Sequence, residues 1–177
     1  MSAASRVAHR LRQFWNALPI PRQPVETEDL LAYLTPAQVA LFRRMQPSEQ
    51  AHAYRMLGSL KATGASDPDL LAAALLHDAG KMLRPLSLFD RVAVVLGKEL
   101  FKNNARKWGE GKSSGLRGAF AVADQHPAWG AELAEKAGAS ARSVELIRRH
   151  QEAAPHHDPL LAALQAADDE IQETRKP

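Results

Sequence analysis

An imidazole and a carboxylate stand side by side in this chain, at the end of a strongly apolar segment. His77 and Asp78 follow an unbroken run of leucine and alanine from Leu70 to Leu76. Such a run predicts a central, buried helix, and burying an unpaired imidazole and carboxylate is costly. A divalent cation is one partner that both side chains can share. The pair therefore predicts a metal site.

The composition narrows the kind of metal. The chain contains no cysteine, which excludes thiolate ligands and disulfide bonds. Nitrogen and oxygen ligands suit Mn, Fe, Zn, Co or Ni, and Mg where waters complete the coordination shell. We therefore expect a divalent metal held by histidine and aspartate. The lack of cysteine also agrees with a cytoplasmic location.

Length and residue usage predict one helical domain. The 177 residues suffice for a single core, and 45% apolar with 24% charged residues is typical of a globular protein. Alanine and leucine dominate, which favours an all-α fold. No apolar run reaches the ~18 residues that a transmembrane helix needs. The net charge of +3 suits a phosphorylated small-molecule partner, and it is too small to predict nucleic-acid binding.

The N-terminal residues are expected to form a short extension. Apolar side chains recur at helical spacing between residues 5 and 18, and prolines then interrupt the chain. Residues 1–30 are therefore interpreted as an amphipathic helix with a proline-rich linker. We expect this helix to pack on the main body rather than to bind a membrane surface or a partner. Residues 31–177 form the main domain.

Local start signals predict the helices of that domain. Thr35 with Pro36, and Asp67 with Pro68, are typical pairs of an N-cap and a first helical residue. Pro127 is expected to separate two helices. The expected helices cover residues 36–45, 48–63, 68–81, 86–96, 118–125, 127–137, 141–152 and 159–174.

The order of these features resembles the HD superfamily of metal-dependent phosphohydrolases. The resemblance rests on an upstream histidine, on Leu-Leu-His-Asp-Ala-Gly-Lys at 75–81 and on a late Ala-Asp pair, and it covers residues 45–175. It implies an HD-type helical domain. It also implies four ligands for a primary metal: His52, His77, Asp78 and Asp168.

Two further assignments follow from the same resemblance. Asp78 and Lys81 are implied as catalytic residues, with Lys81 facing a phosphate of the substrate. Asp169 competes with Asp168 as the late ligand, and the two alanines that precede Asp168 favour the latter.

Two later segments resemble the two-metal branch of the superfamily. Residues 126–132 are similar to its His-Pro-x-x-Gly-Ala-Glu helix start, and residues 150–152 are similar to its His-His-Glu stretch. The resemblance implies that Asp78 bridges two ions and that His126 and His150 bind the second ion.

The sequence departs from that branch in two places. Gln151 stands where the branch has its second histidine, which leaves His156 or His157 as candidate replacements. The Gly-Tyr-Pro motif of the enzymes that cleave cyclic di-GMP is absent, so that substrate is not carried over.

The resemblance implies hydrolysis of a phosphate ester or anhydride in a nucleotide or related small molecule. One or two ions would activate water, and Lys81 would neutralise charge on the phosphoryl group. Two alternatives stay open: a non-catalytic HD-fold module that binds a metal or nucleotide for signalling, and a di-iron oxygenase. Basic residues between 98 and 117 suit either a phosphate-holding lid or a solvated face.

Overall fold

The computed structural model describes residues 26–83, 116–152 and 157–173. Within these residues the backbone forms seven α-helices and one 3-10 helix, with no strand, so the predicted all-α fold class is confirmed. The expected N-terminal helix, the helix expected over 86–96, most of the basic stretch from 98 to 117 and His156 lie outside the described residues.

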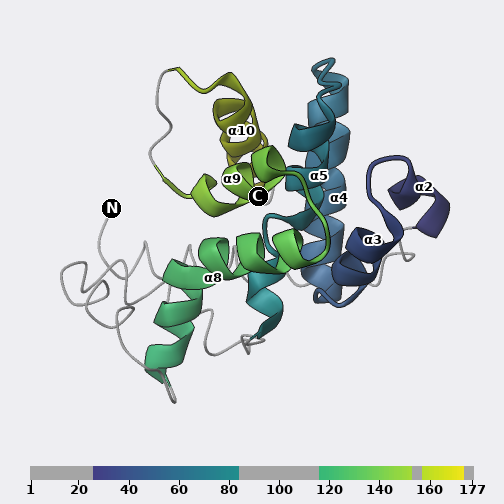
Figure 1. Ribbon diagram of the computed structural model, residues 1–177. Helices are drawn as coiled ribbons and strands as arrows, with labels where there is room; N and C mark the ends of the chain where they lie inside the picture. Colours follow the sequence, from purple (N-terminus) through teal and green to yellow (C-terminus); the bar gives the residue numbers. More distant parts are fainter. Residues whose placement is uncertain (1–25, 84–115, 153–156, 174–177) are drawn as a thin grey trace.

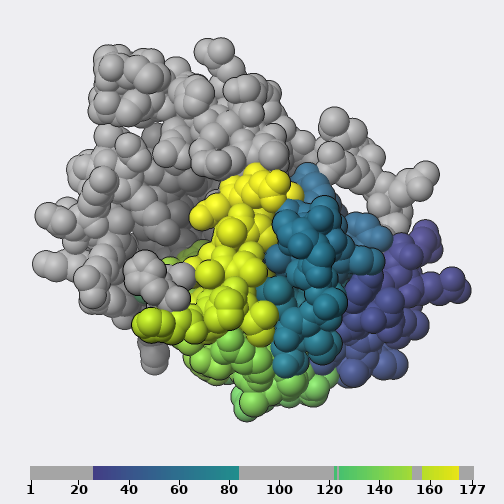
Figure 2. Space-filling model, turned by 90° about the horizontal axis from the view of Figure 1, so that it is seen from above, coloured from purple at the N-terminus to yellow at the C-terminus, as the bar shows by residue number. Residues whose placement is uncertain are grey.

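The helices pack around a central pair. In Figure 1, α4 and α5 run side by side, α8 crosses near one end of the pair, and α9 and α10 lie on the side opposite α2 and α3. Figure 2 shows α10 against the same pair at the surface. The bounds are α2 Thr27–Leu31, α3 Pro36–Arg43, α4 Pro47–Ala62, α5 Pro68–Leu76, η1 Ala79–Leu83, α8 Leu116–Lys136, α9 Ala141–Arg149 and α10 Pro159–Glu173.

Side-chain caps explain where these helices begin. The Thr35 hydroxyl accepts from the Gln38 backbone N–H, and the Gln38 side chain accepts from the Thr35 N–H, which completes a capping box at α3. Asp67 accepts from the N–H groups of the first turn of α5. Both predicted N-caps are confirmed. Ser140 caps α9 in the same way, accepting from the backbone N–H of Ser143.

Three predicted boundaries are wrong. The helix α8 runs without a break through Pro127, which is buried, so tertiary packing offsets the backbone hydrogen bond that proline cannot donate. The helix α5 ends at Leu76 with His77 as its C-cap, and Asp78 lies in the turn before η1 rather than on a helix. The helix α9 ends at Arg149 and does not extend to residue 152.

The core is built around α5. Every residue from Leu70 to Leu76 is buried, as expected for a helix that is apolar on all sides. The short helix α2 spans the boundary predicted between residues 30 and 31, and its Leu30 is fully buried in the same core. Among the described helices, none is both long and apolar enough to cross a lipid bilayer.

Candidate metal centre

Five helices bring the predicted ligands to one end of α5. His52 lies on α4, His77 caps α5, His126 lies on α8 and His150 caps α9. Asp78 follows His77 directly, and Asp168 lies on α10. The four histidines and Asp78 are each 6% exposed or less, and the side chain of Asp168 is 17% exposed.

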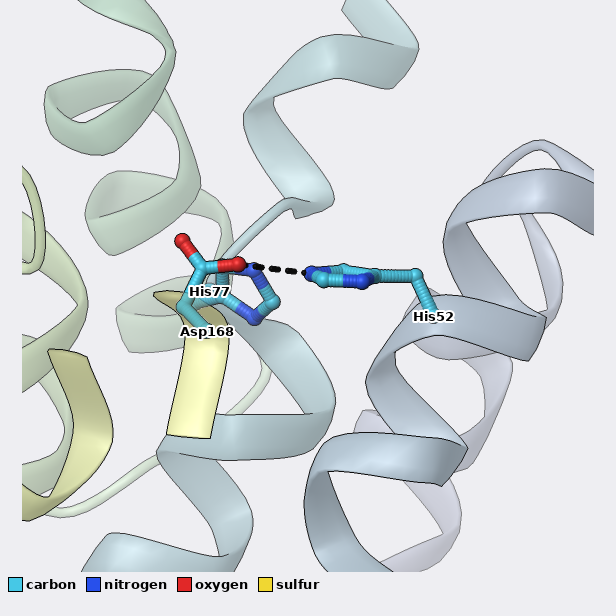
Figure 3. Close-up of side chains that lie close together, drawn as sticks. All are labelled: His52, His77 and Asp168. Atoms are coloured by element: carbon cyan, nitrogen blue, oxygen red, sulfur yellow. Dashed lines mark ion pairs between the residues drawn. The ribbon is translucent and has the colours of Figure 1, made fainter. Parts of the chain in front are cut away.

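One group of possible ligands joins α4, α5 and α10. His52, His77 and Asp168 each offer a ligand atom, and these atoms lie within 4.8 Å of one another. The Nε2 atom of His52 lies 2.9 Å from Oδ1 of Asp168 (Figure 3). The rings of His52 and His77 meet edge to face, with centroids 5.3 Å apart.

A second group shares His77 with the first. The ligand atoms of His77, Asp78 and His150 also lie within 4.8 Å of one another. Nε2 of His77 lies 3.4 Å from Oδ2 of Asp78. On the other side of the carboxylate, Nε2 of His126 lies 3.4 Å from Oδ1. The ring of His150 lies between those of His77 and His126, at centroid distances of 5.1 and 5.2 Å.

The structure thus divides the four implied primary ligands. Within the described residues, Asp78 groups with His77 and His150, whereas His52 and Asp168 form the other group with His77. All six implied ligands are close to the shared His77 or to Asp78.

The tautomers of three histidines are fixed by backbone carbonyls. Nδ1 of His77 lies 3.0 Å from the carbonyl oxygen of Ala74. The corresponding distances are 2.9 Å from His126 to Val122 and 2.7 Å from His150 to Ile147. A carbonyl oxygen can only accept, so Nδ1 carries the proton in each ring. In the neutral form Nε2 is then a bare lone pair, the arrangement that orients a histidine toward a metal.

The Nε2 atoms of these rings find no hydrogen-bond partner in the part of the chain that the structure describes. Within the described residues, Nε2 of His77, His126 and His150 is buried without a partner, and so is Nδ1 of His52. Leaving a buried polar atom unsatisfied costs about 1–3 kcal/mol. A cation supplies the missing partner for several of these atoms at once, and the donor set of imidazole and carboxylate suits a transition metal. The residues therefore fit a divalent ion.

Lys81 brings a positive charge to this site. Its Nζ atom lies 2.6 Å from Oδ2 of Asp78 and 3.7 Å from Oε2 of Glu49. Glu49 is only 6% exposed, and sequence reasoning missed it. The signal was its spacing, because Glu49 precedes His52 by one helical turn and therefore lies on the same face of α4.

Burial and neighbouring charges set the protonation of the centre. Burial lowers the pKa of His150 to about 3, with repulsion from His77 adding to the effect, so this ring is neutral. Burial alone would raise the pKa of Asp78, but His77 and Lys81 outweigh it and hold the pKa well below its usual value.

The two cationic neighbours of Asp78 are affected in the opposite direction. Burial alone would lower the pKa of His77, but the charge of Asp78 outweighs it and the pKa is raised. Burial would likewise lower the pKa of Lys81, and the charges of Asp78 and Glu49 raise it instead. Both groups therefore hold their protons more firmly in the metal-free protein.

Several other candidates lie away from the centre. Gln151 and His157 are exposed, and neither belongs to the two ligand groups found among the described residues. Asp169 is also exposed, whereas Asp168 points to His52. A surface cleft between α2 and α4 contains none of the predicted ligands, and its polar side chains pair with each other: Tyr54 with Asp29, and Lys61 with Tyr33.

Comparisons of the chain with protein-family models, with curated proteins and with solved structures found no match. The resemblance to the HD superfamily therefore stays a prediction from the motifs.

Proposed function

We propose that this protein is a metal-dependent phosphohydrolase of the HD type that acts on a phosphate ester or anhydride of a nucleotide or related small molecule. The observation that carries the proposal is the set of three buried imidazoles whose Nδ1 atoms donate to carbonyls and whose Nε2 atoms have no hydrogen-bond partner among the described residues. The motif resemblance supplies the reaction class. The absence of cysteine supports a cytoplasmic location.

The ligand groups are compatible with one or two ions, and we propose that Asp78 would be the bridging ligand if two ions bind. His77 belongs to both ligand groups, but its Nδ1 is engaged with Ala74, so it has a single lone pair to give. Asp78 has two oxygens, one toward His77 and Lys81 and the other toward His126. A bound divalent ion would lower the pKa of its water and polarise a phosphoryl oxygen.

Lys81 is suited to hold the substrate. Its side chain is 29% exposed, and its ammonium lies beside the buried carboxylate of Asp78. A phosphate next to Asp78 would receive a charge-assisted hydrogen bond from that ammonium. We therefore propose that Lys81 orients the phosphate and offsets the negative charge that grows during hydrolysis.

The first experiment combines metal analysis with a screen of phosphorylated compounds, nucleotides included, in the presence of Mn(II). The wild-type protein should bind metal and release phosphate from at least one compound class. Asp78→Ala should abolish both metal binding and turnover. Lys81→Ala should retain metal and lose most turnover, by about 100-fold, because it removes only the charge on the phosphate. Hydrolysis by metal-free Asp78→Ala protein would falsify the proposal.

Two other results would support the alternatives. Metal-loaded protein that binds a nucleotide tightly, as measured by thermal shift, and hydrolyses none of the compounds would be a signalling module. Oxygen consumption together with a mixed-valence iron signal would indicate a di-iron oxygenase.

A further inference from the structure

A buried carboxylate outside the implied ligand set lies beside the metal centre. Glu49 is as inaccessible as the histidines, at 6% exposure. Its Oε1 accepts from the Ser48 hydroxyl at 3.4 Å, and its Oε2 faces Nζ of Lys81 at 3.7 Å. A buried carboxylate is expensive unless cations or donors surround it, so this placement demands a role.

The ammonium of Lys81 lies between two carboxylates at unequal distances. It is 2.6 Å from Oδ2 of Asp78 and 3.7 Å from Oε2 of Glu49. Oδ2 is also the oxygen that faces Nε2 of His77, and Asp78 and His77 belong to one ligand group. A divalent ion bound there would repel the ammonium of Lys81, because both are positively charged and charges are weakly screened in a buried site. Lys81 must then move away from Asp78, and Glu49 is the carboxylate next to it.

We propose that Glu49 is a positioning residue that receives the Lys81 ammonium when a cation binds at Asp78. The ammonium of Lys81 then pairs with Glu49 instead of Asp78, and it stays beside the site instead of swinging out toward the solvent. The partial exposure of the Lys81 side chain leaves it room for this short movement. The inference rests on the metal-binding part of the proposed function, and it does not require hydrolysis.

The test is a double-mutant cycle read by Mn(II) affinity, using isothermal calorimetry on the full chain. Glu49→Gln keeps the shape of the side chain and removes its charge, and Lys81→Met keeps the apolar stem and removes the ammonium. Glu49→Gln should weaken Mn(II) binding about 10-fold to 100-fold, because Lys81 loses its second anchor and keeps competing for Asp78. Lys81→Met should strengthen binding, because the competing cation is gone.

The combination of both changes decides the matter. In the Lys81→Met background, Glu49→Gln should change the Mn(II) affinity by no more than about twofold. An equal loss in both backgrounds would mean that Glu49 acts on the metal directly, and no loss in either would mean that it has no role; both results overturn the proposal. Glu135→Gln, an exposed charge change on α8, should leave the affinity unchanged.

The same data separate this inference from the proposed function. A wild-type protein that binds no Mn(II) contradicts the metal site itself and the inference with it. A wild-type protein that binds Mn(II), with Glu49→Gln equal to wild type, overturns only the role of Glu49. Circular dichroism of each variant checks that the fold is retained.

Discussion

The ring of His150 is held in its neutral form by the fold alone. It is buried between His77 and His126, and burial lowers its pKa to about 3 from an ordinary value of 6.5. When the chain unfolds, the ring regains its ordinary pKa. At mildly acidic pH the unfolded ring therefore binds a proton, whereas the folded ring stays neutral. The stability from this group is therefore complete above about pH 6.5 and is lost progressively as the pH falls toward 3.

We expect the unfolding free energy of the metal-free protein to fall by about 1.4 kcal/mol for each pH unit below the ordinary histidine pKa. The reason is that the unfolded chain binds one more proton, on His150, than the folded chain. Urea unfolding with chelator at about pH 6 and about pH 5 measures this slope. His150→Gln should remove most of it. An unchanged slope in that variant would show that the ring is not held neutral.

His77 does not interfere in that pH range. Its pKa is raised, so its contribution to stability is fully present below the ordinary value of 6.5 and is lost only as the pH rises through the folded value. In the acidic range the ring is protonated in both the folded and the unfolded chain. In the acidic range, the fall of the unfolding free energy with decreasing pH therefore reports on His150. Above neutrality, its fall with increasing pH reports on His77.

At the scale of elements, two glycines allow α8 to approach η1. A Cβ atom on Gly80 would lie 2.1 Å from the carbonyl oxygen of His126 and 2.7 Å from the backbone nitrogen of Gly130. Gly130 in turn lies close to the backbone of Gly80 and His77. This contact places His126 opposite Asp78, so the glycine at position 80 is required by packing and not by backbone conformation.

Gly80→Ala should destabilise the protein by at least about 2 kcal/mol, because the methyl group meets backbone atoms that cannot move aside. It should also weaken Mn(II) binding, since His126 is displaced from Asp78. Gly58→Ala is the matched control: it lies in α4 with open space around the added Cβ. That change should stabilise by about 0.5–1 kcal/mol through helix propensity. Equal effects in urea unfolding would contradict this account of the contact.

Local signals predicted helix starts well and helix ends poorly. Thr35 and Asp67 are caps that act within one turn, so the sequence alone identifies them. Pro127 and Asp78 were misplaced because their conformation depends on distant residues. The close contact of α8 with η1 keeps the helix continuous at Pro127, and the turn after His77 directs Asp78 toward His126 and Lys81.

At the scale of the molecule, residue types predicted which side chains lie together, and the packing of the helices sets how they are arranged. The six implied ligands do meet at one end of α5. Their division into two groups around His77 depends on where α4 and α10 lie relative to α9, which no local pattern encodes. The contact between Glu49 and Lys81 was missed for the same reason, because the two residues are on α4 and η1.

A metal ion at this centre would join α4, α5 and α10, which also pack through the apolar core and through the ion pair of His52 with Asp168. His52 on α4, His77 at the end of α5 and Asp168 on α10 would share one ion, so binding should stabilise the whole fold. At about 100 times the dissociation constant, Mn(II) should add about 2.7 kcal/mol to the unfolding free energy.

The adjacent aspartates of α10 separate this effect from nonspecific binding. Asp168→Asn should lose most of the stabilisation by Mn(II), because the amide keeps the size of the side chain but is a poor ligand. Asp169→Asn removes the same charge from an exposed neighbouring position and should retain the wild-type gain. Thermal unfolding with Mn(II) or chelator measures both. Equal losses would mean that the ion is attracted to the acidic surface of α10, whereas a loss confined to Asp168 requires the ion to bind where α4, α5 and α10 meet.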